Sequence, residues 1–244
     1  MRIARLVTPE GPRHAVARGD RWMLIDDPFA SPLVESGQSV SLAGARLLAP
    51  IVPRVVVGIA HNPRDHHALP IQAWLKSVHT VVGPGADIHR ATDVGTVNVE
   101  GELAVVIGRT SAALTLENAF DHVLGYTIAN DVTNVSQVPI DEKNFQSKAG
   151  VGYTPLGPWI ETGLADPENV ATEVVVNGEV RAESGSYNLL SSVAATLVHT
   201  TRWLTLEAGD VVMTGAPGTF TPVEAGDVVE ITLGGIGTLT NRIV

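Results

Sequence analysis

The chain has 244 residues with a formal net charge of −10, and its sequence pI is about 5.2. Such an acidic chain lacks the basic footprint of a nucleic-acid-binding protein, and the same charge disfavours an anionic membrane surface. There are no cysteines, so disulfides, thiolate nucleophiles and zinc–sulfur sites are excluded. No stretch approaches the roughly 18 apolar residues of a membrane span, and residues 1–5 (MRIAR) carry no apolar signal segment, so we expect a cytoplasmic protein.

The first 50 residues predict a small β-rich subdomain. Short apolar runs at 2–7, 14–17, 22–25 and 42–48 alternate with Gly- and Pro-containing turns. Two prolines at 50 and 53 mark its end. We therefore expect a small N-terminal β subdomain over 1–50 and a larger domain over 54–244.

The larger domain begins with a continuous apolar strand over 54–60, and a polar segment with three histidines follows it over 61–67. Loops that leave buried strands often carry functional residues, and histidine serves as base, proton shuttle or ligand near neutral pH. A solvated loop with no such role is the alternative. A helical turn carrying Trp74 and Lys76 is expected over 70–76, and a strand over 78–82.

Two carboxylates open the next apolar strand, predicted over 99–108. Side chains alternate faces along a strand, so Glu100 and Glu102 point the same way, about 7 Å apart along the chain. Like charges side by side are unfavourable without a counter-charge. A divalent cation bound between the two carboxylates would remove that cost. The alternative is that both carboxylates are solvated at an exposed strand end, where no cation is needed.

A third carboxylate follows a further predicted strand. A helix capped by Thr115 is expected over 116–124, and a short strand over 126–129 leads to Asp131. Three carboxylates completed by water suit the octahedral preference of Mg²⁺ or Mn²⁺. Asp131 could instead cap a helix or form an Asx turn. The polar stretch over 132–152, with Lys143 and Lys148, predicts a loop or lid.

The rest of the chain predicts mostly strands. Asn177-Gly178 between two β-branched runs indicates a type I′ hairpin, and Ser191 or Ser192 is expected to cap a helix over 193–203. Strands are predicted over 210–213, 227–233 and 238–244. The fold class is therefore α+β, dominated by sheet and arranged as a rolled or barrel-like sandwich with few helices.

Several of these motifs together resemble the fumarylacetoacetate hydrolase (FAH) superfamily. The matching segments, in chain order, are VEGELAVVIG over 99–108, GYTIANDVT over 125–133, Lys148 followed by PLGPWI over 155–160, VNGE over 176–179, the GDVVMTGAPG run ending at 218, and GDVVE through GIGTLTN over 226–241. The resemblance extends from about residue 55 to the C-terminus.

The resemblance implies a mixed β-sandwich roll, or distorted barrel, and a homodimer. It also implies a bound Mg²⁺ or Mn²⁺ on Glu100, Glu102 and Asp131. The family's activities include hydrolysis of acylpyruvates, decarboxylation of β-oxo acids and tautomerisation of 2-hydroxydienoates, so a small 2-oxo or 2-hydroxy acid is the expected substrate. Its carboxylate and adjacent oxygen would chelate the metal, which would stabilise an enolate. Lys148 would donate to the developing charge or to a carboxylate.

The sequence departs from the family pattern where the hydrolases activate water. His66 aligns with the histidine of the family's His–Glu dyad, with His61 as a competing candidate, but Leu69 stands at the glutamate position. The remaining departures are Val135 at an arginine, Ala216 at a carboxylate-binding threonine and Val151 at a lid aspartate. We take Lys76, Thr214 and Gly215 as candidate substrate-binding residues.

These departures favour a tautomerase or decarboxylase over an acylpyruvate hydrolase, in the catabolism of aromatic or related compounds. The alternative hypothesis is a catalytically degenerate FAH-like protein that serves in binding or assembly. An intact carboxylate trio favours the enzyme.

Overall fold

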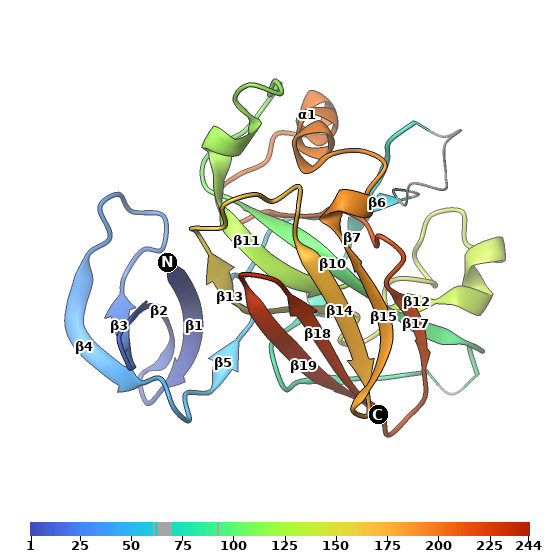
Figure 1. Cartoon of the computed structure of the whole chain (residues 1–244), viewed down its shortest axis with the longest axis horizontal. Coiled ribbons are helices and arrows are strands. Elements are labelled where there is room, and N and C mark those ends of the chain that lie inside the picture. The colour runs from blue at the N-terminus through green and yellow to red at the C-terminus, as the bar shows by residue number, and fades with distance from the viewer. Residues whose placement is uncertain (61, 63–69, 92) are drawn as a thin grey trace.

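The computed structural model of the chain describes residues 1–60, 62, 70–91 and 93–244. Their strands form a 14-stranded sheet and a five-stranded sheet, both mixed (Figure 1). This is the expected α+β class dominated by sheet, and the two sheets do not close into a barrel.

The larger sheet runs in the order β4-β3-β2-β1-β13-β11-β10-β16-β6-β7, with β5, β8, β12 and β17 paired beside this path. Its strands are β1 (Arg2–Thr8), β2 (Gly11–Arg18), β3 (Arg21–Ile25), β4 (Glu35–Ser41), β5 (Leu47–Leu48), β6 (Val56–Ala60), β7 (Gln72–Lys76), β8 (Val81–Val82), β10 (Val97–Ile107), β11 (Val123–Asn130), β12 (Thr133–Asn134), β13 (Thr154–Glu161), β16 (Val211–Met213) and β17 (Phe220–Val223).

The smaller sheet runs β15-β14-β18-β19-β9. Its strands are β9 (Asp87–Ile88), β14 (Ala171–Val176), β15 (Glu179–Gly185), β18 (Val228–Leu233) and β19 (Gly237–Ile243). In the Asn177-Gly178 turn both residues have positive φ, 54° and 80°, as the predicted type I′ hairpin requires.

Helices are few among the described residues. The α-helix α1 (Val193–Trp203) is capped by Ser192, whose side chain accepts from the Ala195 N–H. The 3₁₀ turns are η1 (Val78–Thr80), η2 (Ala119–His122), η3 (Val135–Ile140) and η4 (Ser186–Asn188). In this part of the chain no helix is long and apolar enough to cross a membrane.

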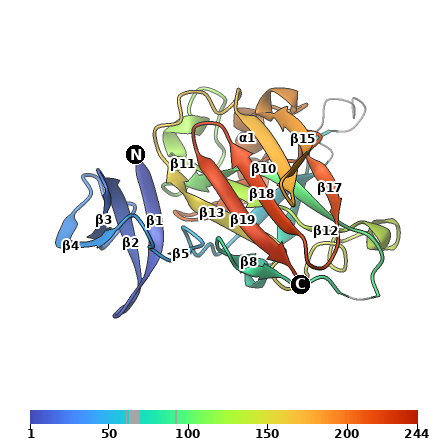
Figure 2. The same ribbon diagram turned by 60° about the horizontal axis from the view of Figure 1, so that its bottom comes forward.

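Strand β10 is buried on both faces, which explains its continuous apolar run. Val99, Leu103 and Val105 lie in one hydrophobic cluster, whereas Ala104 and Val106 lie in another. The smaller sheet packs against β10, β11 and β13 (Figure 2). Apolar packing on both faces therefore fixes the position of the strand that carries Glu100 and Glu102.

The N-terminal strands β1 to β4 lie to one side of the remaining fold (Figure 1). They join it through β1, which pairs with β13 at Arg2↔Glu161 and Ile3↔Ile160. The division at residues 50 to 54 stays a prediction.

Two segments predicted as helical differ in the structure. The helix expected over 116–124 is reduced to η2, and β11 begins at Val123. Within this segment Ala119 is fully buried, whereas Phe120 is 39% exposed. Residues 72–76 form β7, because they pair along their whole length with β6. Pairing with β6 overrides the local helical preference of residues 72–76.

Gly58 in β6 permits a close packing contact with Trp74, its cross-strand partner in β7. A Cβ at Gly58 would lie 2.6 Å from the Trp74 ring. We predict that Gly58→Ala lowers the free energy of unfolding by about 1–3 kcal/mol, measured by urea denaturation. Gly234→Ala is the control, because its nearest contact would be an ordinary 3.7 Å. Equal stability of the two variants would contradict this packing.

Candidate active site

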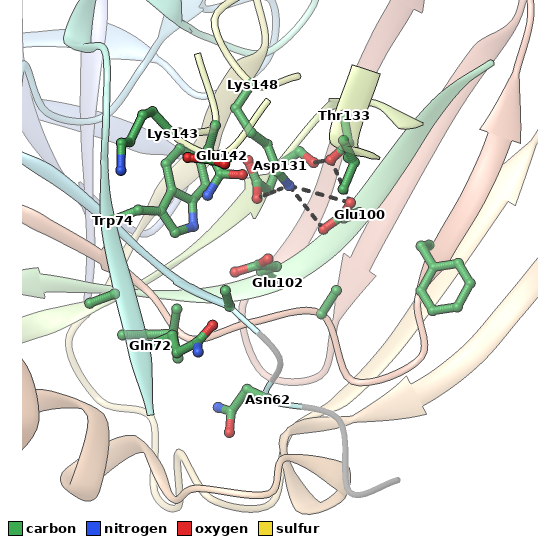
Figure 3. A pocket seen from close by; sticks show the side chains of 17 residues that line it. Asn62, Gln72, Trp74, Glu100, Glu102, Asp131, Thr133, Glu142, Lys143 and Lys148 are labelled. Atoms are coloured by element: carbon green, nitrogen blue, oxygen red, sulfur yellow. Dashed lines mark hydrogen bonds and ion pairs between the residues drawn. The ribbon is translucent and has the colours of Figure 1, made fainter. Parts of the chain in front are cut away.

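Two neighbouring strands bring three carboxylates together. Glu100 and Glu102 lie on one face of β10, and Asp131 follows the end of β11, the strand beside it. The Asp131 N–H donates to the Glu100 carbonyl oxygen at 3.0 Å, which fixes the end of β11 against β10. One carboxylate oxygen of each acid lies within 4.8 Å of the others (Figure 3).

Two lysines from separate segments contact Asp131. Lys76, the last residue of β7, donates to Oδ1, and Lys148 donates to Oδ2. The Lys148 Nζ also lies 3.4 Å from both carboxylate oxygens of Glu100, so its ammonium group lies between the two acids (Figure 3). The Lys76 side chain is fully buried.

Short hydrogen bonds orient the two glutamates. The Thr133 hydroxyl donates to Glu100 Oε1 at 2.5 Å, and the Gly215 N–H donates to Glu102 Oε2 at 2.8 Å. Glu102 has no lysine or arginine partner in the described part of the chain (Figure 3). Among the described side chains, three carboxylates thus face two ammonium groups, and the carboxylate without a cationic partner is Glu102.

Burial and neighbouring charges shift the pKa values of the three acids in different directions. Burial raises the pKa of Glu102 well above its usual range, and repulsion from Asp131 and Glu100 adds to this rise. Burial also raises the pKa of Glu100, although Lys148 opposes it. Burial would raise the pKa of Asp131 as well, but the attraction of Lys148 and Lys76 outweighs it and lowers that pKa.

The pKa values of the two lysines shift in opposite directions. Burial lowers the pKa of Lys76 despite its contact with Asp131. Burial acts to lower the pKa of Lys148 too, but attraction to Asp131 and Glu100 outweighs burial and raises it. Lys148 is therefore the firmly cationic group of the site.

The donor set fits a hard divalent cation. Carboxylate oxygens are the ligands that Mg²⁺ and Mn²⁺ prefer, and three of them converge here from a rigid sheet. A cation would also supply the charge that buried Glu102 lacks among these side chains.

A cavity of about 770 Å³ opens onto the three carboxylates (Figure 3). Apolar groups line part of it, among them Trp74 from β7 and Phe220 from β17. Polar side chains line the rest, including Asn62, Gln72 and Lys148. A cavity of this size with a few convergent polar groups is typical of a small-molecule site.

The predicted substrate-binding residues occupy supporting positions. Lys76 is paired with Asp131 rather than exposed in the main cavity. Thr214 is buried, and its hydroxyl donates to the Leu103 carbonyl at 2.9 Å. Gly215 contributes its N–H to Glu102. The histidine candidates, His61 and His66, lie outside the described residues.

Sequence reasoning missed two cavity residues. Trp74 was assigned to a helical turn, and only the β6–β7 pairing places its ring on the cavity wall. Asn62 belongs to the polar stretch that follows β6, and the sequence does not distinguish it from its polar neighbours there. Its buried amide is a signal that only the folded chain reveals.

Comparison with known proteins identifies the family. Residues 52–244 match the model described as fumarylacetoacetate (FAA) hydrolase C-terminal, and residues 1–50 match an Rv2993c-like N-terminal model. The chain belongs to the FAA hydrolase family.

Relatives of similar length support this assignment. Protein Rv2993c of Mycobacterium tuberculosis is 36% identical, covering 100% of this chain and 98% of that protein. Oxaloacetate tautomerase YisK of Bacillus subtilis is 34% identical over 93% of this chain and 84% of its own. The structure described as 5-carboxymethyl-2-hydroxymuconate delta-isomerase from Mycobacterium smegmatis has a TM-score of 0.95 and 38% identity, covering 100% of this chain and 99% of that one. Two of these relatives are enzymes by name, which supports enzymatic activity for this chain.

The unbalanced charge of Glu102 yields a stability prediction. Its pKa is raised on folding, so the folded state disfavours the ionised form, and this penalty grows as the pH rises above the unfolded pKa. In chelator at pH 8, Glu102→Gln should therefore raise the free energy of unfolding by about 1–2 kcal/mol. At pH 4 the difference from the wild type should become small, because Glu102 is then mostly protonated in both states.

Urea denaturation at the two pH values measures this effect. Glu230→Gln, a change of the same chemistry in β18 of the smaller sheet, is the matched control and should show no such gain. If Glu102→Gln is instead less stable than the wild type at pH 8, the Glu102 carboxylate is already stabilised in the folded protein, which would contradict this prediction.

Proposed function

We propose that the chain is a divalent-metal-dependent tautomerase of a small 2-oxo or 2-hydroxy acid. The observation that carries the proposal is the convergence of three carboxylates and one firmly cationic lysine, Lys148, on a small-molecule cavity. Two relatives that extend over most of the chain are named as an oxaloacetate tautomerase and a hydroxymuconate isomerase.

In this proposal Glu100, Glu102 and Asp131 hold Mg²⁺ or Mn²⁺. When bound, the cation supplies Lewis acidity, which stabilises negative charge on an oxygen beside the substrate carboxylate. The short contacts from Thr133 and Gly215 hold the glutamates in a fixed orientation, and such outer contacts typically tune ligand geometry.

Lys148 holds a positive charge at the cavity wall. Its Nζ donates to Asp131 and Glu100, and in this proposal it also binds the substrate's carboxylate or enolate oxygen. Trp74 lies on the same wall, with its ring centroid 5.5 Å from Lys148 Nζ. The indole excludes water from one side of the ammonium group and so strengthens its electrostatic effect.

Tautomerisation also requires a group that carries a proton between carbon and oxygen. His66 is our first candidate for this role, and His61 is the second. Hydrolysis requires more, because a water molecule must be activated by a His–Glu pair, and Leu69 stands where the glutamate is expected. One proton carrier is enough for tautomerisation, so this chemistry suits the residues present.

We also propose a cellular setting for this activity. The family resemblance favours a cytoplasmic homodimer that acts in the catabolism of aromatic or related compounds. The acidic net charge of −10 favours a small-molecule partner over nucleic acid.

The proposal is tested by the ketonisation of enol-oxaloacetate, followed by ultraviolet absorbance. With Mn²⁺ we expect saturable turnover that chelator abolishes. Lys148→Met should lower kcat by at least about 100-fold, and Lys148→Arg should restore part of it because the positive charge is kept.

Glu230→Gln serves as the control here as well and should retain wild-type turnover. Full activity of the wild type in chelator would contradict the metal-dependent mechanism. Ligand-induced thermal stabilisation without turnover on any 2-oxo acid tested would instead favour a binding protein.

A further inference from the structure

Asn62 joins three segments at the cavity wall. It follows β6 and is only 2% exposed. Its side-chain oxygen accepts from the Ser191 N–H at 2.7 Å, and its side-chain nitrogen donates to the Thr214 carbonyl at 2.7 Å and to the Ser191 carbonyl at 3.3 Å. Both ends of the amide are satisfied, so its orientation is fixed.

The peptide that Asn62 contacts is also the one that contacts Glu102. The Asn62 amide binds the Thr214 carbonyl, and the next N–H, that of Gly215, donates to Glu102 Oε2 at 2.8 Å. In a planar trans peptide the C=O and N–H groups point in opposite directions. Asn62 and Glu102 therefore hold opposite edges of one peptide plane.

Packing leaves this peptide little freedom to rotate. Gly215 has φ = +100°, and a Cβ there would lie 2.8 Å from Asn62 Cβ. Only glycine allows this close approach without strain. On the preceding residue, the Thr214 hydroxyl and N–H both donate to the Leu103 carbonyl, at 2.9 and 3.1 Å.

We propose that Asn62 is a positioning residue that orients the Glu102 carboxylate for cation binding through the Thr214–Gly215 peptide. The inference rests on the proposed function, because it takes Glu102 as a metal ligand. Hydrogen-bonding partners that orient a ligand typically contribute 10- to 100-fold to metal affinity. Asn62 would have this effect indirectly, through the peptide that binds Glu102, and its side chain lies on the wall of the same cavity.

A matched control separates positioning from simple structural support. Asn241 in β19 is 3% exposed, and its side-chain nitrogen also donates to two carbonyls, those of Gly83 at 3.0 Å and Ala86 at 2.8 Å. Asn62→Asp and Asn241→Asp therefore remove the same kind of interaction. Each change replaces a donor by an acceptor of the same shape.

Two measurements on the full chain test the inference. Titration calorimetry with Mn²⁺ should show affinity at least about 10-fold weaker for Asn62→Asp, and near wild type for Asn241→Asp. The amide resonance of Gly215 should shift in Asn62→Asp without metal, because its hydrogen bond to Glu102 changes, and should stay in place in Asn241→Asp. Asn62→Ser removes the amide without adding charge, and so provides a second test if aspartate is not tolerated at this buried position.

The outcomes are distinguishable. A wild type that does not bind Mn²⁺ would contradict the proposed function. Wild-type Mn²⁺ affinity and an unmoved Gly215 resonance in the Asn62 variants would overturn the positioning role while leaving the metal site intact. Equal weakening by Asn241→Asp would show that the effect is general loss of stability.

Discussion

The site depends on an imbalance of buried charge. Two adjacent strands bring Glu100, Glu102 and Asp131 together, and in the described part of the chain two lysines neutralise only part of that charge. Among the described residues, Glu102 has a backbone N–H, that of Gly215, as its hydrogen-bond donor. A buried carboxylate in this position costs stability, and proteins commonly accept such a cost where function requires it. Binding of a divalent cation at the three acids would explain the arrangement.

The sheet makes the arrangement rigid. Because side chains alternate along β10, a one-residue slip would move Glu100 and Glu102 to the face on which Val99 and Leu103 pack in the hydrophobic core. Pairing with β11 then fixes Asp131 relative to Glu100. The lysines enter from β7 and from the segment after η3, so the charged centre joins parts of the chain that are far apart in sequence. Glu100 and Glu102 lie within a strand, which holds ligands more precisely than a loop does.

The carboxylate trio was predictable because its signals are local. Two acids at i and i+2 on an apolar strand define a shared face, and Asp131 ends a second apolar run. The α1 helix and the Asn177-Gly178 hairpin were predictable for the same reason. The conformations of residues 72–76 and 116–124 were not, since they are set by pairing with β6 and by the start of β11. The contact of Lys76 with Asp131 and the contact of Asn62 with the Thr214–Gly215 peptide likewise link residues more than 50 positions apart.

The central claim is that Glu100, Glu102 and Asp131 together bind a divalent cation. Anomalous diffraction from crystals grown with Mn²⁺, recorded at the manganese edge, tests it most directly. We predict one strong peak within about 2.0–2.2 Å of an oxygen of each of the three carboxylates. Crystals that hold Mn²⁺ elsewhere, with no anomalous peak among these three side chains, would contradict the account.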